Sequence, residues 1–290
     1  MLDAVVLAYH KVDARREAGI TRVSPAAFRD GLDALLAAGW LPGDPEGPEW
    51  RLAPRVDGLR LAPRVDGTMA AASPPAGRFV VTFDDGYAGF LDHALPALLE
   101  RGIRPLLFPI VGWVGRSNGW DHPIFRRPFP HLGWEGLAEA LRRGVRVGSH
   151  GWGHWDLRRV SPDALHRELL GSRRALEDRL GAGVESFSYP YGRVGLRERE
   201  ACAQAGYRRA FALGPSGRPG DPWRIPRLPV HAATSPAGLP LRASAFARAG
   251  RGAPVDRFIS WCSGGTPWLL QGVLGRGVEA PAARSPAPAP

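Results

Sequence analysis

The sequence predicts an α/β fold built around a parallel sheet or barrel. Short apolar runs alternate with stretches whose apolar residues recur at helical spacing, and this alternation continues to about residue 231. Sustained alternation of strands and helices is the signature of a parallel sheet or barrel. The run at Arg78–Phe83 is apolar and β-branched, which is typical of a strand buried on both faces. The expected strands are Val5–Ala8, Arg78–Phe83, Pro105–Ile110, Val145–Ser149, Val184–Tyr189, Arg208–Leu213 and Ile225–Val230.

Helix signals lie between these runs. Ser24-Pro25 and Ser161-Pro162 each combine an N-cap residue with a proline at the first helical position. After Ser24 the apolar face is Phe28, Leu32, Leu35 and Leu36, and Gly39 ends the helix. After Ser161 it is Leu165, Leu169, Leu176 and Leu180. Further helices are expected over 90–99, from Trp134, and over 196–205.

One domain is expected over residues 1–240, with a Pro/Gly-rich insert at 42–77. The insert holds a tandem duplication, residues 51–59 and 60–67, which we interpret as a surface insertion because two copies are too few for a solenoid. Residues 241–278 form an extension, with a helix expected over 255–274. The Ala/Pro-rich residues 279–290 are expected to be disordered.

Composition excludes several classes of protein. The net charge of +10 comes from scattered arginines, with Lys11 the only lysine, so we expect no nucleic-acid partner. No stretch has the eighteen apolar residues of a membrane span, so no stable membrane insertion is expected. No export signal is visible, which predicts a cytoplasmic protein for the sequence as written; a different start would leave export open. Cys202 and Cys262 are interpreted as structural.

Two adjacent acids, Asp84 and Asp85, follow the Arg78–Phe83 run and precede Gly86. Ligands bind at the carboxyl ends of strands in parallel α/β folds. Two neighbouring carboxylates are costly to hold together unless a cation or a proton separates them. The alternative is a simple turn, because Asp-Gly is a common turn dipeptide.

A second candidate group follows the Val145–Ser149 strand. His150 and His154 are four residues apart, so both imidazoles would point the same way on a helical turn, although Gly151 and Gly153 favour a loop that leads into a helix. Alone, the pair is weak evidence for a metal site, because hydrogen-bonded or exposed histidines without a metal are commoner. Together with a strand-end carboxylate it makes a two-His, one-carboxylate set, an arrangement known for catalytic Zn²⁺ and similar ions.

The order of the motifs resembles the polysaccharide deacetylases, carbohydrate esterase family 4. Thr-Phe-Asp-Asp-Gly-Tyr is followed by Ser-His-x-x-x-His-x-x-Leu and then by Phe-Ser-Tyr-Pro-Tyr-Gly. The opening Ala-Tyr-His-Lys-Val and the late Ile-Pro-Arg-Leu-Pro-Val are also similar. The resemblance covers residues 4–231. It implies a distorted (β/α) barrel of about seven parallel strands that removes N-acetyl groups from N-acetylglucosamine-type glycans.

The resemblance also implies roles. Asp85, His150 and His154 would hold one divalent metal ion, with Zn²⁺ expected and Co²⁺ or Ni²⁺ as alternatives. Asp84 would be the general base on a metal-bound water, and His231 the acid that protonates the leaving amine. The residues expected to contact the glycan substrate are His10, Trp152, Pro190, Tyr191 and Arg227.

The sequence departs from the family pattern at two positions. Gly151 stands where a Ser or Thr usually follows the first metal histidine, and Ser188 stands where many members carry an arginine that orients the base. Either Arg227 replaces that arginine, or Asp84 is held differently. Two rival functions stay open: a metal hydrolase of a small acetylated metabolite, and an inactive glycan-binding relative. The sugar, its linkage and the oligomeric state are not specified.

Overall fold

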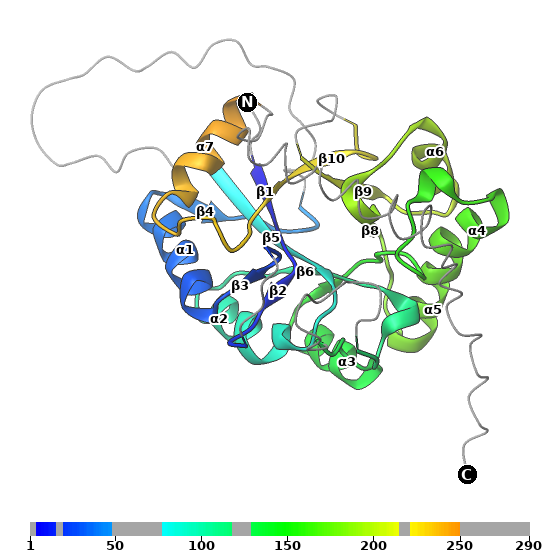
Figure 1. The fold of residues 1–290 in the computed structure, drawn as a ribbon, viewed down its shortest axis with the longest axis horizontal. Helices are drawn as coiled ribbons and strands as arrows, with labels where there is room; N and C mark the ends of the chain where they lie inside the picture. The colour runs from blue at the N-terminus through cyan, green and yellow to red at the C-terminus, as the bar shows by residue number, and fades with distance from the viewer. Residues whose placement is uncertain (1–3, 16–19, 48–76, 118–128, 215–220, 250–290) are drawn as a thin grey trace, which may run out of the picture.

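The computed structural model describes residues 4–15, 20–47, 77–117, 129–214 and 221–249. Strands and helices alternate along the chain as predicted (Figure 1). The strands are β1 Ala4–Tyr9, β2 Lys11–Val12, β3 Arg22–Val23, β4 Trp40–Pro42, β5 Gly77–Asp85, β6 Leu106–Pro109, β7 Arg146–Val147, β8 Ser186–Ser188, β9 Arg209–Leu213 and β10 Ile225–Pro229. The α-helices are α1 Pro25–Ala37, α2 Leu95–Leu99, α3 Trp134–Arg142, α4 Pro162–His166, α5 Ser172–Leu180, α6 Leu196–Gln204 and α7 Leu239–Ala249.

The strands form a nearly closed parallel barrel with the helices around its outside (Figure 1). Neighbouring strands are hydrogen-bonded in the order β7-β6-β5-β1-β10-β9-β8, and β4 adds to β5 outside this row. The two ends of the row meet where a parallel bridge joins Ser149, just after β7, to Phe187 in β8. The predicted distorted (β/α) barrel of about seven strands is therefore confirmed.

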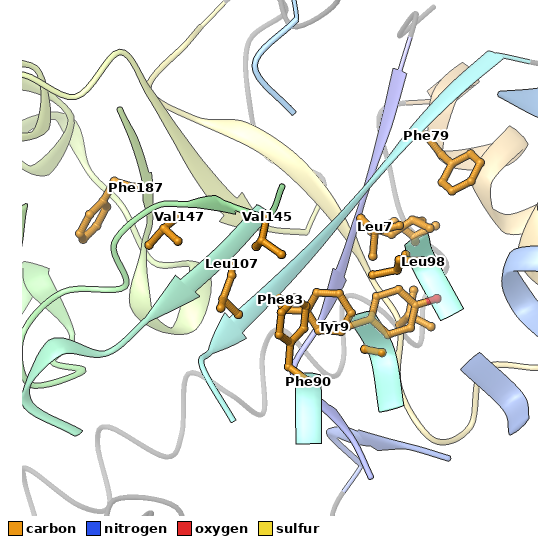
Figure 2. Packing of buried hydrophobic residues seen from close by; sticks show 14 of the residues in the cluster. Leu7, Tyr9, Phe79, Phe83, Phe90, Leu98, Leu107, Val145, Val147 and Phe187 are labelled. Atoms are coloured by element: carbon orange, nitrogen blue, oxygen red, sulfur yellow. The ribbon is translucent and has the colours of Figure 1, made fainter. Parts of the chain in front are cut away.

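Side chains alternate between the barrel interior and the surrounding helices along each strand. In β1, Val5, Leu7 and Tyr9 belong to the large buried cluster beneath the helices, where Leu7 and Tyr9 lie near Leu98 and Phe83 (Figure 2). Val6 points the other way and belongs to a separate buried cluster. Its other members come from β6, β9 and β10: Leu106, Phe108, Phe211 and Ile225. These side chains fill the interior of the barrel.

Toward the carboxyl ends of the strands the inward positions become polar. Thr82 and Asp84 follow Val80 on the inward side of β5, and Arg227 follows Ile225 on β10. Ser188 ends β8 on the same side. All four polar side chains are buried. An apolar interior therefore supports a layer of charged and hydroxyl groups at the end of the barrel where ligands bind in parallel folds.

The predicted caps are present. The Ser24 hydroxyl accepts the N–H of Ala27 at 3.2 Å, and the Ser161 hydroxyl accepts that of Ala164 at 3.2 Å. Helix α7 spans the expected boundary at residue 240 and packs against α1 and β1. Most of the 42–77 insert, the helix expected over 255–274 and the expected disordered tail lie outside the described residues.

The helix expected over 90–99 differs in one respect. It begins as a π-helical turn, Phe90–Ala94, and becomes α-helical only at Leu95, where Pro96 fits the start of a helix. Leu99, its last residue, is 37% exposed. Within the ranges given above, no helix is long and apolar enough to cross a membrane.

Candidate metal centre

The site is assembled from the ends of β5 and β7. Asp84 and Asp85 are the last residues of β5, and Asp85 has a φ of 69°, in the left-handed region. This turn takes Asp85 out of the strand alternation, which would otherwise point adjacent side chains in opposite directions. His150 follows β7, and its backbone N–H donates to the carbonyl of Pro109 at the end of β6. The ends of β5 and β7, on either side of β6, therefore deliver the acids and the first histidine to one place.

Three buried side chains converge there with their donor atoms facing one another. Asp85 Oδ1 lies 3.6 Å from His150 Nε2 and 3.7 Å from His154 Nε2, and one ligand atom from each residue lies within 4.8 Å of the others. These distances exceed a hydrogen bond. Ligand atoms bound to one tetrahedral Zn²⁺ lie about 3.4 Å apart. The spacing and chemistry of the three donors fit a divalent metal ion.

Both histidines are held in the form that binds metal. His150 Nδ1 lies 2.7 Å from the carbonyl oxygen of Ser188, so Nδ1–H donates and the Nε2 lone pair faces Asp85. Burial lowers the pKa of His150 despite the nearby charge of Asp84. Burial and the neighbouring His150 lower the pKa of His154 well below its usual value. Both rings are therefore neutral near pH 7 and available as ligands.

The segment that carries the two histidines is not helical. His154 has a φ of 60° and Gly151 a φ of 82°, and α4 begins only at Pro162. The helical-turn geometry considered from the four-residue spacing is therefore wrong, whereas the loop favoured by the glycines is present. The N–H groups of Trp152 and Gly153 donate to the Glu168 carboxylate instead of to a helical ladder. The imidazoles still approach each other, with ring centroids 5.0 Å apart.

Asp84 is held in place by a buried arginine of β10, which is separated from β5 by β1. Arg227 donates from Nη1 and Nη2 to the two carboxylate oxygens of Asp84, both at 2.7 Å. The same guanidinium donates to the hydroxyls of Ser188 at 2.7 Å and Thr82 at 3.1 Å. Burial alone would raise the pKa of Asp84, but the charges of Arg227 and His150 hold that pKa well below its usual value. Asp84 is therefore ionised across the neutral range.

Arg227 thus contacts the acid that the missing family arginine would orient. The guanidinium reaches Asp84 from β10, and Ser188, which occupies the usual arginine position, becomes one of its acceptors. The replacement left open by the sequence is present in the structure. Arg227 was expected among the residues that contact substrate, but its buried guanidinium is committed to Asp84.

The remaining candidates surround this centre. His10 follows β1, and burial lowers its pKa to about 4 although the charge of Asp84 opposes this. His231 is buried after β10, and its backbone N–H donates to Thr234 Oγ1 at 3.1 Å.

The Pro-Tyr-Gly turn and Trp152 differ in their surroundings. Pro190 is buried at the start of a short 3₁₀ turn, and Tyr191 has a φ of 59°. The Tyr191 ring lies 4.5 Å from the His154 ring, so this turn borders the candidate metal site. Trp152 is partly buried and packs against the large apolar cluster beneath the helices. Its indole therefore anchors the loop, and its contact with substrate stays a prediction.

Comparison with known proteins agrees with this geometry. Residues 71–210 match the family model described as polysaccharide deacetylase. The solved structure of IcaB from Ammonifex degensii superposes with a TM-score of 0.62 at 27% identity, over 85% of this chain and 97% of that one. Residues 71–210 therefore match the polysaccharide deacetylase family in sequence, and the barrel matches the fold of the deacetylase IcaB.

Curated members of the family match over part of their length. The putative polysaccharide deacetylase YxkH of Bacillus subtilis is 27% identical over 142 residues, which is 49% of this chain and 47% of YxkH. The peptidoglycan-N-acetylglucosamine deacetylase PgdA of Listeria monocytogenes is 26% identical over 123 residues, 42% of this chain and 23% of PgdA. The match thus spans half or less of these relatives.

Sequence analysis missed two residues that hold the candidate site in place, Ser188 and Glu168. The Ser188 hydroxyl was noted only as the absence of the family arginine, and Glu168 was not singled out. A signal for Glu168 was available, because it lies on the apolar face of its helical segment with Leu165, Leu169 and Leu176. A charged residue at an apolar-face position predicts a buried carboxylate with specific partners.

Proposed function

We propose that this chain is a metal-dependent hydrolase that removes N-acetyl groups from N-acetylglucosamine-type glycans. One observation carries the proposal: the metal-type donors of Asp85, His150 and His154 converge beside Asp84, a carboxylate held ionised by Arg227. Amide hydrolysis near neutral pH needs an activated water, a base and stabilisation of the oxyanion. The site offers a group for each requirement.

Asp85, His150 and His154 would hold the ion. A divalent ion bound there supplies Lewis-acid chemistry, polarising the acetamide carbonyl and making water a usable nucleophile near pH 7. Zn²⁺ suits two imidazoles and a carboxylate with open positions, and Co²⁺ and Ni²⁺ are the alternatives. The three protein ligands leave room for substrate and water.

Asp84 is the proposed base. Its two oxygens are fixed by Arg227, so the carboxylate cannot rotate away from the attacking water, and Arg227 keeps it ionised. The low pKa that results makes Asp84 a weak base, so its contribution depends on position more than on proton affinity. Both the orientation and the charge state of Asp84 therefore depend on Arg227, which reaches β5 from β10 with β1 between the two strands.

His231, which follows β10, is the candidate for returning a proton to the leaving amine, as the family resemblance implies. Burial lowers the pKa of His10 to about 4, so its ring is neutral near pH 7 and it stays in the proposed substrate-contacting set. The backbone of Tyr191, beside His154, is the candidate second donor to the oxyanion. Pro190 and Trp152 complete the proposed substrate-contacting set, since apolar surfaces suit the apolar faces of sugar rings.

The proposed substrate class rests on the relatives. PgdA is named as a peptidoglycan-N-acetylglucosamine deacetylase, and the matched fungal relative from Cryptococcus neoformans as a chitin deacetylase. These names concern those proteins, and the shared feature is an acetylated amino sugar within a glycan. An acetamido sugar in a chain is therefore the first substrate to test.

The test measures acetate release from N-acetylglucosamine oligomers. The purified protein is assayed as isolated, after chelation and after addition of Zn²⁺, Co²⁺ or Ni²⁺. Asp84→Asn should lower kcat by about 10²–10⁴-fold, because it removes the proposed base. Asp33→Asn, an acid on the exposed side of α1 paired with Arg101, is the matched control and should be unaffected.

Each outcome decides a part of the proposal. Metal-dependent release that Asp84→Asn abolishes supports the reaction and the base together. Metal bound without release from any oligomer would refute the glycan substrate, and small acetylated amino sugars and esters would be assayed next. A protein that binds none of these metals would refute the site.

A further inference from the structure

The loop from His150 to His154 carries two of the three proposed metal ligands without any regular secondary structure of its own. Its shape must therefore be imposed by hydrogen bonds from outside. On one side, the N–H groups of Val111 and Gly112 donate to the carbonyls of Gly151 and Trp152 at 3.1 and 2.8 Å. These bonds tie the loop carbonyls to the segment that follows β6.

On the other side, two of the loop N–H groups converge on one carboxylate, while the N–H of Gly151 donates to the Ser149 hydroxyl at 3.1 Å. Trp152 N–H donates to Glu168 Oε2 at 2.8 Å. Gly153 N–H donates to Oε1 at 2.9 Å and to Oε2 at 3.1 Å. Glu168 is only 3% exposed, and burial raises its pKa to about 7 although these N–H bonds oppose the rise. A buried acid whose oxygens both face one short loop is well placed to set the shape of that loop.

The loop also packs directly against this carboxylate. A Cβ added at Gly151 would lie 2.6 Å from Glu168 Oε2, and Gly151 has a φ of 82°, which disfavours other residues. Position 151, where the family usually carries a Ser or Thr, is therefore glycine because no side chain fits between the loop and Glu168. The Glu168 carboxylate fills the place beside the loop from which a side chain at 151 is excluded.

We propose that Glu168 is a positioning residue for the metal centre: its carboxylate holds the His150–His154 loop in the shape that brings both imidazoles to Asp85. This inference rests on the proposed metal-dependent function. Glu168 acts through the backbone N–H groups of Trp152 and Gly153, two of the three residues between the histidines. The Glu168 carboxylate thus stabilises the loop in place of the hydroxyl that a Ser or Thr at position 151 would provide.

The chain offers a matched control in Glu198. This glutamate is also 3% exposed, and its Oε2 accepts the N–H of Gly195 at 2.7 Å at the start of α6. Its other oxygen pairs with Arg197 at 2.8 Å. Glu198 is therefore also a buried carboxylate that accepts a backbone N–H, but it stabilises the start of a helix and not the loop that carries the two histidines.

The first measurement is the affinity of the metal-free protein for Zn²⁺ alone, by competition with a chromophoric chelator. Glu168→Gln should weaken Zn²⁺ binding about 10–100-fold, the usual effect of losing a group that orients metal ligands. The amide of Gln accepts one loop N–H but turns its own N–H₂ group toward the other. Glu198→Gln should leave Zn²⁺ affinity within about twofold of the wild type.

The second measurement needs no metal. Amide hydrogen exchange at Trp152 and Gly153 in the metal-free protein should accelerate by about tenfold or more in Glu168→Gln and stay unchanged in Glu198→Gln. Unchanged exchange and unchanged Zn²⁺ affinity in Glu168→Gln would overturn the inference while leaving the proposed function intact. Equal losses in both variants would also overturn it, because they would indicate a general loss of stability. A wild type that binds no Zn²⁺ would refute the metal site and this role of Glu168 together.

Discussion

The Asp84–Arg227 pair is a deeply buried ion pair, with side chains 1% and 0% exposed. Removing two charges from water costs several kcal/mol per ion, so such a pair is rarely a net source of stability. The bidentate geometry and the hydroxyls of Thr82 and Ser188 satisfy the guanidinium and offset part of that cost. What the arrangement provides is a carboxylate of fixed direction and fixed charge, which is what the proposed base requires.

Breaking this pair from one side should be costly. Arg227→Met leaves Asp84 buried without its counter-ion, and we expect the free energy of unfolding to fall by about 3–5 kcal/mol. The double variant Asp84→Asn/Arg227→Met removes both charges and should recover much of this loss. Urea unfolding of both single variants and of the double variant gives the coupling energy. Additive losses would show that the two side chains do not stabilise each other.

The lowered pKa of Asp84 predicts a stability change in acid. In the unfolded chain the carboxyl takes up a proton near its ordinary pKa of 3.8, whereas the folded protein resists protonation because its pKa is lower. The unfolded state therefore binds more protons below that pH, and stability falls as the pH falls. Between pH 5 and pH 3 the wild type should lose about 1 kcal/mol more than Asp84→Asn. Urea unfolding at several pH values tests this, and parallel curves would contradict it.

At the scale of elements, the barrel is held closed by a short seam. β7 is only two residues long, and the segment after it meets β8 through the bridge of Ser149 with Phe187. Ser149 N–H donates to the carbonyl of Ser186 at 2.9 Å. His150 is the next residue. The closure of the barrel and the position of the first proposed metal ligand therefore depend on the same few hydrogen bonds.

Gly148 makes this seam possible by its small size. A Cβ there would overlap the Phe108 ring and lie 2.7 Å from the carbonyl oxygen of Ser186. Gly148→Ala should lower the free energy of unfolding by about 1–3 kcal/mol and weaken Zn²⁺ binding, because the strand must move away from β8. Gly183→Ala, where no atom lies within 4 Å of the added Cβ, should change stability by less than about 0.5 kcal/mol. Equal effects of the two substitutions would refute this account, and thermal unfolding separates them.

The elements themselves were largely predictable because their signals are local. Apolar runs predicted the strands, Ser-Pro pairs predicted the starts of α1 and α4, and strand ends in a parallel fold necessarily share one edge. From that rule alone, Asp85, His150 and His154 are expected at one edge of the barrel.

Other features depend on contacts that a sequence does not specify. Arg227 reaches Asp84 because β1 lies between β5 and β10 and sets both registers, Val6 opposite Arg227 and Ala8 opposite Thr82. No local pattern gives that register. The non-helical course of the His150–His154 loop likewise depends on Glu168, fifteen residues beyond Gly153. The packing of α7 on α1 was not predicted because its segment carries no cap or periodicity strong enough to single it out.

At the scale of the whole molecule, the proposed metal joins segments that follow different strands of the barrel. Asp85 comes from β5, and the histidines come from the segment after β7, with β6 between these strands. An ion that binds the folded state and not the unfolded chain stabilises the protein by mass action. Metal binding should therefore stabilise the whole barrel as well as enable the proposed reaction.

This predicts a metal-dependent unfolding temperature. At a free Zn²⁺ concentration about 100 times Kd the stabilisation is about 2.7 kcal/mol, or about 5–10 °C in the midpoint of unfolding for a domain of this size. His154→Gln should abolish that increment, whereas His166→Gln, on exposed α4, should retain it. Calorimetry with and without chelator measures all three proteins. An increment that survives His154→Gln would place the bound ion elsewhere on the molecule, since loss of one of three ligands should weaken this site far below the concentration used.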